Sequence, residues 1–308
     1  MDPVSAQQNL QVSEIWRYPI KSIGGEPLTA AQLDEDGITG DHMWALVDMI
    51  TGTVASAKRS RRWGWLLQCS ARLHEGADPD DAAALVITMP DGGEFTADDP
   101  AAMNRLSALA DRPVRLQYVA AGRKTMEMEW AEETREGMEQ AIAYSSARAE
   151  QDADSTVPIG AVPTGGGRER FYDVAPLHII TTSSARQLDD GVPVREALRK
   201  YRPNIVVGND DWDDGYAEDA WLSEVVDIGA AQARPTTPVG RCVMVNLSHG
   251  SAPQDQLALR RIAARHRMDV GYGTAPVPAL GIYADVARCG AVSIGDSVQP
   301  TSALTDRC

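Results

Sequence analysis

Short apolar runs divided by turn residues dominate the first third of the chain. These β-prone runs lie at 12–18, 43–48, 54–57, 85–89 and 114–119. Turn residues follow two of them, at Thr51-Gly52 and at Asp91-Gly92-Gly93, as is typical of hairpins. Asp99 before Pro100 predicts a helix over 101–110, because Asp caps a helix and Pro fits its first position. The pattern therefore predicts a small barrel or sandwich that carries a helix.

Beyond residue 168, strand and helix patterns are mixed. Strands are predicted at 177–182, 204–207, 282–286 and 291–298, a Pro-rich strand-like segment at 234–242, and helices at 193–201 and 254–268. Because strands and helices are mixed without regular βαβ alternation, the pattern favours an α+β fold, mostly β, over a doubly wound sheet.

The middle of the chain differs in composition from both ends. Glu, Ala, Met and Arg, all good helix formers, are concentrated at 126–151. A polar run and the triple glycine at 165–167 then predict a loop. We therefore predict an N-terminal domain at 8–125, a helical and loop linker at 126–167 and a C-terminal domain at 168–302. The linker's composition permits either a lid or a spacer.

Length and charge narrow the class of protein. A chain of 308 residues fits about two domains. The net charge of -15 argues against a nucleic-acid or anionic membrane partner, because both favour basic patches. The sequence shows no long apolar span and no signal-peptide pattern at its first residues, so we expect a cytoplasmic protein, as a monomer or small homo-oligomer.

Four cysteines are spread along the chain without a CxxC pair or a Cys/His cluster. They are Cys69, Cys242, Cys289 and Cys308. We expect reduced thiols and neither a zinc site nor a cysteine-ligated iron–sulfur cluster. Arg241 stands next to Cys242, and a guanidinium favours the thiolate that ligates soft metals or attacks sulfur. The same cysteine is also compatible with a structural place in the core.

Several short motifs follow one another in a specific order. They are Tyr18-Pro19-Ile20-Lys21-Ser22, the run 40–48 from Gly-Asp-His to Asp, Tyr201-Arg202-Pro203-Asn204 with 216–221 beyond it, Gly240-Arg241-Cys242, and the run 290–298. This ordered set resembles the MOSC superfamily, and specifically its two-domain, amidoxime-reducing members with an N-terminal MOSC β-barrel domain. The resemblance implies an N-terminal β-barrel-like domain and a C-terminal MOSC β-barrel with flanking helices.

The resemblance also implies a molybdopterin-type molybdenum cofactor between the domains, with the thiolate of Cys242 on the metal. The positions matching the family's cofactor-binding residues are Lys21, Ser22, His42, Lys58, Thr181, Thr182, Arg202, Asn204 and Arg241. Lysine, arginine, hydroxyls and amides suit a pterin that bears a phosphate, and a thiolate suits molybdenum. Ordinary surface, turn or capping roles remain open for the same residues.

Departures from the family pattern weaken the expected grip on a cofactor. His42 and Lys58 stand where the family commonly has arginine, and Gly240 replaces a serine. The loop after the cysteine is also remodelled, and it contains His249, seven residues beyond Cys242. We predict that His249 is a catalytic proton donor at the rim of the site. The other histidines and the aromatic run 216–221 are expected to serve surface or packing roles.

Three functions follow as alternatives. The first is a molybdenum-dependent oxidoreductase that reduces small N-hydroxylated or N-oxide substrates with electrons from an external donor protein. The second is a sulfur carrier with a persulfide on Cys242, which the substitutions at His42, Lys58 and Gly240 favour slightly. The third is a cofactor-free binding module. The superfamily is sometimes associated with pyridoxal phosphate, but this sequence offers no Schiff-base lysine setting.

Overall fold

The computed structural model describes residues 10–119, 125–129, 149–151, 158–163, 170–188, 193–209, 212–271 and 275–301. A closed barrel is built from strands β13 (Leu177–Thr181), β14 (Ile205–Val207), β1 (Leu10–Arg17), β20 (Ser297–Thr301), β15 (Val225–Ile228), β16 (Ala231–Gly240) and β18 (Val277–Arg288), paired in that order. Pairing of β13 with β18 closes the ring. The β13–β14 pair is parallel, and the other pairs in the ring are antiparallel.

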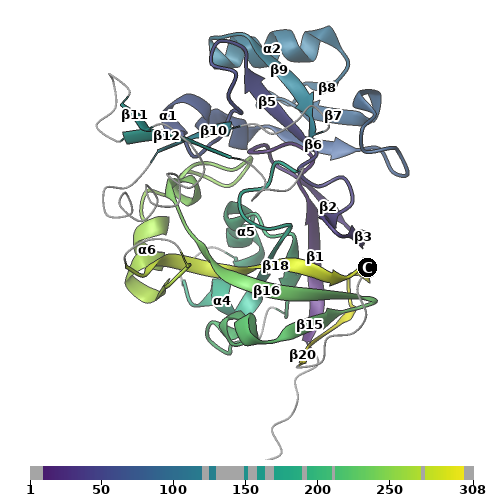
Figure 1. Cartoon of the computed structure of the whole chain (residues 1–308), viewed down its shortest axis with the longest axis vertical. Coiled ribbons are helices and arrows are strands. Elements are labelled where there is room, and N and C mark those ends of the chain that lie inside the picture. The colour runs from purple at the N-terminus through teal and green to yellow at the C-terminus, as the bar shows by residue number, and fades with distance from the viewer. Residues whose placement is uncertain are drawn as a thin grey trace, which may run out of the picture.

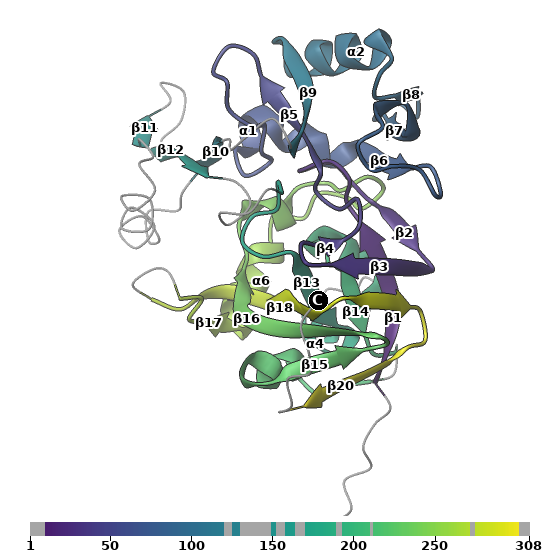
Figure 2. The same cartoon turned by 45° about the vertical axis from the view of Figure 1, so that its right-hand side comes forward.

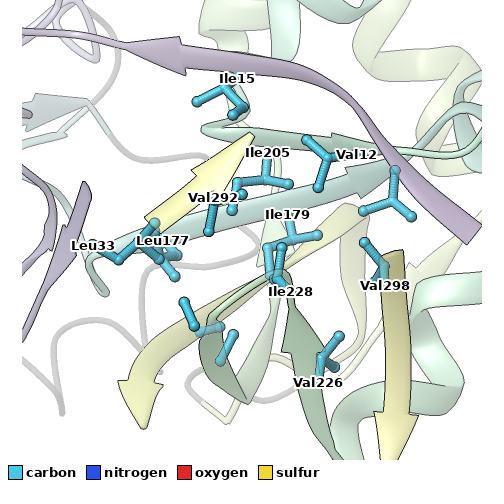
Figure 3. Packing of buried hydrophobic residues seen from close by; sticks show 14 of the residues in the cluster. Val12, Ile15, Leu33, Leu177, Ile179, Ile205, Val226, Ile228, Val292 and Val298 are labelled. Carbon is cyan, nitrogen blue, oxygen red and sulfur yellow. The ribbon is translucent and has the colours of Figure 1, made fainter. Parts of the chain in front are cut away.

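The first strand of the chain is therefore a strand of the barrel formed by the C-terminal half (Figure 1). Strand β1 lies between β14 and β20, with Ile15 opposite Ile205 and Leu10 opposite Val298. Both Ile15 and Ile205 are buried in the core of the barrel (Figure 3). The two halves of the chain consequently share one hydrophobic core.

Further short strands extend the barrel. They are β2 (Glu26–Leu28) beside β1, β17 (Arg267–Met268) beside β18, and a sheet of β19 (Gly290–Ser293), β3 (Ala30–Asp34) and β4 (Gly37–Ile38). Leu33 of β3 and Ile38 of β4 pack in the same core as the barrel strands. Strands β1, β3 and β4 thus pack in the barrel core although they belong to the N-terminal half of the sequence.

The remainder of the N-terminal half forms a second unit above the barrel (Figure 2). It contains β5 (Trp44–Asp48) paired with β9 (Val114–Tyr118), a sheet of β6 (Ser70–Leu73), β7 (Leu85–Thr88) and β8 (Glu94–Thr96), the helices α1 (Ser60–Trp63) and α2 (Pro100–Ala110), and the 3₁₀ helices η1 (Gly64–Gln68) and η2 (Ala82–Ala84). Its separate core includes Ile20, Trp63 and Leu106.

Helices lie outside the barrel strands. They are α4 (Thr182–Arg186), α5 (Val194–Leu198), which continues as η6 (Arg199–Tyr201), η7 (Ala217–Ser223), η8 (Val243–Asn246) and α6 (Ala258–Arg265). The α+β, mostly β prediction is confirmed, and the cap of α2 is as expected, with Asp99 accepting a hydrogen bond from the Ala101 amide at 2.8 Å. No described helix is long and apolar enough to span a membrane.

Some local predictions are wrong. The stretch predicted to begin a helix at 126 is strand β10 (Thr125–Glu129), which pairs with β12 (Pro158–Pro163), itself beside β11 (Ala149–Gln151). Alternation of Met and Glu at 126–129 has the period of a strand, which outweighs helix propensity. The rest of the predicted linker lies outside the described residues, and the domain boundaries remain predictions.

Three other expectations also need correction. The run 291–298 is not one strand, because a turn around Gly295 separates β19 from β20 into different sheets. The run 54–57 makes only an isolated bridge, between Val54 and Val47. Cys69 and Cys242 are free thiols, but Cys289 is disulfide-bonded, so the expectation of reduced thiols is wrong there. Sequence spacing alone says nothing about which distant thiols the fold brings together.

The shared core gives a direct prediction. Replacing Ile15 with Ala should lower the free energy of unfolding by about 3 kcal/mol, because it leaves a cavity between β1 and its neighbours. Replacing the exposed Ile50 should change it by less than about 0.5 kcal/mol. Urea unfolding measures both variants. Equal stabilities would contradict the inclusion of β1 in the barrel core.

Candidate functional site

The site begins where β1 leaves the barrel. A turn over residues 19–22 carries Lys21 to the boundary between the barrel and the second unit. The backbone amide of Lys21 donates to the Trp44 carbonyl at 2.9 Å. Ile20 and Ile23 are fully buried on either side and hold the turn in the second core. Ser22 has a left-handed backbone, with φ of 62°, and its Oγ accepts a hydrogen bond from the Ala57 amide at 3.1 Å. Lys21 and Ser22 are therefore fixed by packing on both sides.

A carboxylate bridges two lysines next to this turn. Asp173, in the segment that leads into β13, has Oδ1 2.5 Å from the Nζ of Lys21 and Oδ2 2.9 Å from the Nζ of Lys58. Lys21 also donates to the Phe171 carbonyl at 2.7 Å. The side chains of Lys21, Lys58 and Asp173 are 4%, 17% and 26% exposed, so Lys21 is the deepest of the three.

Electrostatics keep all three groups of this bridge charged. Burial opposes the charge on Asp173, but the two ammonium groups outweigh it and hold the pKa of Asp173 well below its usual range. Burial also opposes the charge on Lys58, yet Asp173, Cys242 and Tyr283 together raise the pKa of Lys58. Lys58 therefore stays an ammonium beside the carboxylate of Asp173.

Arg202 adds a further cation, with an unsatisfied donor. Its guanidinium lies over the ring of Tyr18, 4.3 Å from the ring centroid, and its pKa is lowered by burial and raised in part by Tyr18, Asp41 and Asp173. Nη2 of Arg202 is buried and has no hydrogen-bond partner. Such a donor is rare in native proteins, where buried polar groups are nearly all bonded. The residue also has a left-handed backbone, with φ of 54°, uncommon for a non-glycine residue.

Arg241, in contrast, is bonded within the barrel. Nε donates to the Leu280 carbonyl at 3.0 Å, Nη1 to the Tyr201 carbonyl at 3.0 Å, and Nη2 to Nε2 of His178 at 2.7 Å. Because Nε2 of His178 accepts, its Nδ1 carries the proton and donates to the Arg202 carbonyl at 3.1 Å. Burial, followed by Arg241, lowers the pKa of His178 well below its usual value, consistent with this neutral form.

The network fixes the backbone around the cations. Asn204 accepts from the His178 amide at 3.0 Å through Oδ1 and donates to the Trp16 carbonyl at 3.3 Å through Nδ2. The half-buried Cys242 follows Arg241 at the end of β16. Hydrogen bonds of Arg241, His178 and Asn204 thus connect β1, β13, β14 and β16. These three side chains bond to backbone atoms and to each other, so they hold the strands that carry the site in place.

The two threonines are also bonded internally. Thr181 caps α4 by accepting from the Ser184 amide and donates to Oε2 of Glu218 at 2.5 Å. Thr182 donates to the Asn209 carbonyl at 2.7 Å. These bonds lie at the C-terminal end of β13, whereas His178 and the segment carrying Asp173 are at its start. The threonines hold α4 and η7 against the barrel.

His42 and Arg202 both lie next to the ring of Tyr18. Its backbone is left-handed, with φ of 50°, and its Nδ1 is 2.5 Å from Oδ2 of Asp41. Its ring centroid is 6.0 Å from that of Tyr18, the ring that Arg202 covers. The His42 amide bonds to the Tyr18 carbonyl, and its carbonyl accepts from the Phe171 amide. His42 therefore joins the turn after β1 to the segment that carries Asp173.

His249 is tied to its own loop. Its Nε2 donates to the Met244 carbonyl at 2.9 Å, and burial lowers its pKa to about 4. The imidazole is consequently neutral at pH 7, and its Nε2–H donates a hydrogen bond to the Met244 carbonyl. A catalytic role remains a prediction, but this geometry favours a role in holding the loop that follows Cys242.

Comparison with known proteins agrees with this arrangement. A family model for the MOSC domain matches residues 166–299, and one for the MOSC N-terminal beta barrel domain matches residues 9–63. The chain contains a MOSC domain behind a MOSC N-terminal beta barrel domain. The Cys242 strand lies in the first match, and Lys21, Ser22, His42 and Lys58 lie in the second. The site described above draws on both.

Curated relatives of this MOSC protein are distant. Mitochondrial amidoxime reducing component 2 of Homo sapiens is 22% identical over 95% of this chain and 84% of its own length. Mitochondrial amidoxime-reducing component 1 of Mus musculus is also 22% identical, over 95% of this chain and 82% of its own. Among solved structures, the YUAD protein from Bacillus subtilis shares 12% identity over 94% of each chain, with a TM-score of 0.39.

Sequence reasoning missed one residue that organises this MOSC site. Asp173 follows the aromatic pair Phe171-Tyr172 in a segment without periodicity, and only its spatial position beside Lys21 and Lys58 reveals it. His178 was expected at the surface or as a hydrogen-bonded core residue, and it is the latter, linking Arg241 to the Arg202 backbone. Its place within an apolar strand was the available signal, because a buried histidine needs partners.

Removing the bridging carboxylate tests the electrostatic account. Asp173→Asn should lower the free energy of unfolding at pH 7 by about 3 kcal/mol, because it leaves two partly buried ammonium groups without their counter-charge. Since the folded-state pKa of Asp173 is depressed, its contribution is complete above pH ~4 and is lost as the pH falls. The exposed Asp80→Asn is the control. Wild type and D173N with equal unfolding midpoints in urea at pH 7 would refute the bridge.

A second test uses the depressed pKa of His249. An unfolded histidine binds a proton near pH 6.5 and the folded one near 4, so stability should fall as the pH drops through this window, by roughly 3 kcal/mol. In His249→Gln, whose amide can still donate to the Met244 carbonyl, this part of the slope should vanish. Urea unfolding at pH 7, 5.5 and 4.5 measures both, and parallel slopes would contradict the assignment.

Proposed function

We propose that this MOSC protein is a molybdenum-cofactor-dependent oxidoreductase that reduces small N-hydroxylated or N-oxide substrates with electrons from an external donor protein. The observation that carries the proposal is the pairing of both Lys21 and Lys58 with Asp173, together with the buried, unpaired Nη2 of Arg202 and the free thiol of Cys242. The curated relatives that span nearly the whole chain are amidoxime reducing components. No group of three metal-ligating side chains occurs among the described residues, so a metal would have to arrive with its own ligands.

The residues present fit a bound anion. Two ammonium groups share the one carboxylate of Asp173, which leaves an excess of positive charge on this bridge. Nη2 of Arg202 is a buried donor that lacks an acceptor, and a lysine ammonium has three donors, of which Lys21 uses two. Phosphate oxygens suit such donors, and a thiolate suits a soft metal. Arg202, Lys21 and Lys58 would hold the phosphate end of the cofactor, with Cys242 as the ligand to the metal.

The chemistry that such a cofactor supplies when bound is the two-electron removal of oxygen from an N–O bond. Converting N–OH to N–H and water consumes two electrons and two protons, so the electrons must come from a donor protein. Asp173 would orient the two lysines, while His178 and Arg241 keep the Arg202 backbone and the end of β16 in register. The positive charge of Lys58 would favour the thiolate of Cys242.

A persulfide carrier is the second candidate, and one observation favours it. The same pairing of Lys58 with a free, half-buried Cys242 would also stabilise a nucleophilic sulfur without any metal. The two functions differ in what is bound to the cysteine. A carrier holds sulfur that cyanide releases, whereas the oxidoreductase holds molybdenum together with phosphorus.

Elemental analysis decides between them. Protein purified from a host that makes the cofactor should contain close to one molybdenum and one phosphorus-bearing cofactor per chain. Cys242→Ala should lose at least about tenfold of the molybdenum, since the direct ligand is removed. Cys69→Ala, at the buried thiol of the second core, should keep it. Absence of molybdenum in wild type, with cyanide-labile sulfur on Cys242, would overturn the oxidoreductase in favour of the carrier.

A further inference from the structure

His42 forms a dyad with the carboxylate that precedes it. Its Nδ1 lies 2.5 Å from Oδ2 of Asp41, whose side chain is only 3% exposed. The other oxygen of Asp41, Oδ1, accepts from the Tyr18 amide at 2.6 Å, so the carboxylate is held on both sides. A carboxylate that accepts from Nδ1 fixes the orientation of an imidazole and leaves Nε2 as the nitrogen for other chemistry.

The free edge of this ring is accessible. The His42 side chain is 17% exposed, and its Nε2 forms no hydrogen bond with any described residue. The backbone of His42 is also left-handed, as is that of Ser22 and of Arg202. Left-handed backbones of non-glycine residues are costly and gather at functional sites, where the surrounding structure enforces them. Exposure of Nε2 gives solvent protons a route to the dyad.

Two sets of contacts place the dyad next to the cations of the site. The His42 carbonyl accepts from the Phe171 amide at 2.9 Å, and the Phe171 carbonyl accepts from Nζ of Lys21 at 2.7 Å. The ring of His42 is 6.0 Å from that of Tyr18, over which the guanidinium of Arg202 lies. One residue therefore separates His42 from Lys21, and one separates it from Arg202.

No second carboxylate binds the imidazole among the described residues. The charged and titratable groups around the dyad have other hydrogen bonds: Arg170 with the Asp41 carbonyl and Asp34, Arg17 with Glu26, Tyr18 with the Pro203 carbonyl, and Lys21 with Asp173. Arg202 keeps its unused Nη2 donor. The protonation of His42 is thus coupled directly to Asp41, and its Nε2 stays free for a ligand.

The other four histidines are less suited to proton transfer. His249 donates from Nε2 to a backbone carbonyl, and burial lowers its pKa to about 4, so it carries no excess proton at pH 7. His178 and His266 each have both ring nitrogens hydrogen-bonded. His74 is exposed directly after β6 and forms no ion pair with a described carboxylate. His42 alone combines an orienting carboxylate, a free Nε2 and a place beside the cations.

We propose that His42 is the proton donor of the reaction, with Asp41 as its positioning residue. The inference rests on the proposed function, in which N–OH becomes N–H and water. The N–O bond breaks as two electrons enter from the donor protein. One proton passes from Nε2 of His42 to the oxygen that leaves as water, the other reaches the nitrogen from solvent, and solvent reprotonates the imidazole. Arginine at this position could not do this, because a guanidinium does not deprotonate in proteins.

Nitrogen-15 NMR of the histidine rings tests the dyad without turnover. At alkaline pH, long-range proton–nitrogen spectra of wild type should show His42 protonated at Nδ1 and bare at Nε2. Asp41→Asn should lose this preference, because its side-chain amide can donate to Nδ1 instead. A wild-type ring that carries its proton on Nε2 would overturn the dyad.

Turnover of benzamidoxime by the holo protein, with dithionite as reductant, tests the proton transfer. His42→Gln should lower kcat about 100-fold and change KM by less than about twofold, since a general acid acts in the transition state. Asp41→Asn should lower kcat about tenfold, and the exposed control His74→Gln should match wild type. The fall in wild-type kcat as the pH rises between about 5 and 8 should be absent in H42Q, and added imidazole should restore part of its rate.

Molybdenum content separates proton transfer from a grip on the cofactor. H42Q should contain as much molybdenum as wild type. Loss of molybdenum from H42Q, or a wild-type rate and pH profile in it, would overturn the proton donor. Wild type without molybdenum and without amidoxime reduction would refute the proposed function and the donor role with it, whereas the NMR spectra judge the dyad by itself.

Discussion

Insertion of β1 between β14 and β20 is the constraint on which the site depends. Without β1 the ring would open, because β14 and β20 would each lose the partner on one side, and two rows of backbone groups would lose their hydrogen bonds. Because β1 is fixed in this way, the turn after it emerges at one defined edge of the barrel. Lys21 reaches Asp173 there, at the entrance to β13, and Tyr18 reaches Arg202, before β14.

Residues around this edge divide into two groups. The first group positions strands. Its members, Arg241, His178 and Asn204, form hydrogen bonds with backbone atoms and with each other. Lys21 and Lys58 share the carboxylate of Asp173, and Nη2 of the nearby Arg202 keeps an unused donor. Arg241 belongs to the first group although it stands directly before the cysteine. Its guanidinium fixes the strand that presents the thiol.

Local chemistry made much of the fold predictable. Asp99 and Pro100 mark the start of α2, and the apolar run before Thr182 marks β13, because capping and strand burial act within a few residues. The ordered motifs likewise indicated Lys21, Arg202 and Cys242. Asp173 could not be found in this way, since its role exists only once β1 and β13 meet. The disulfide at Cys289 also depends on tertiary proximity, which spacing does not encode.

Lysine at position 58 is better understood from its neighbours than from the arginine it replaces. A guanidinium would pair bidentately with Asp173, so two of its N–H donors would bind the same carboxylate. An ammonium is a compact charge that Asp173 holds through one oxygen, 2.9 Å away. Its other two protons stay available to further acceptors, because a lysine ammonium has three donors. Lysine at this position therefore gives up the bidentate geometry of a guanidinium but keeps a positive charge and free donors beside Asp173.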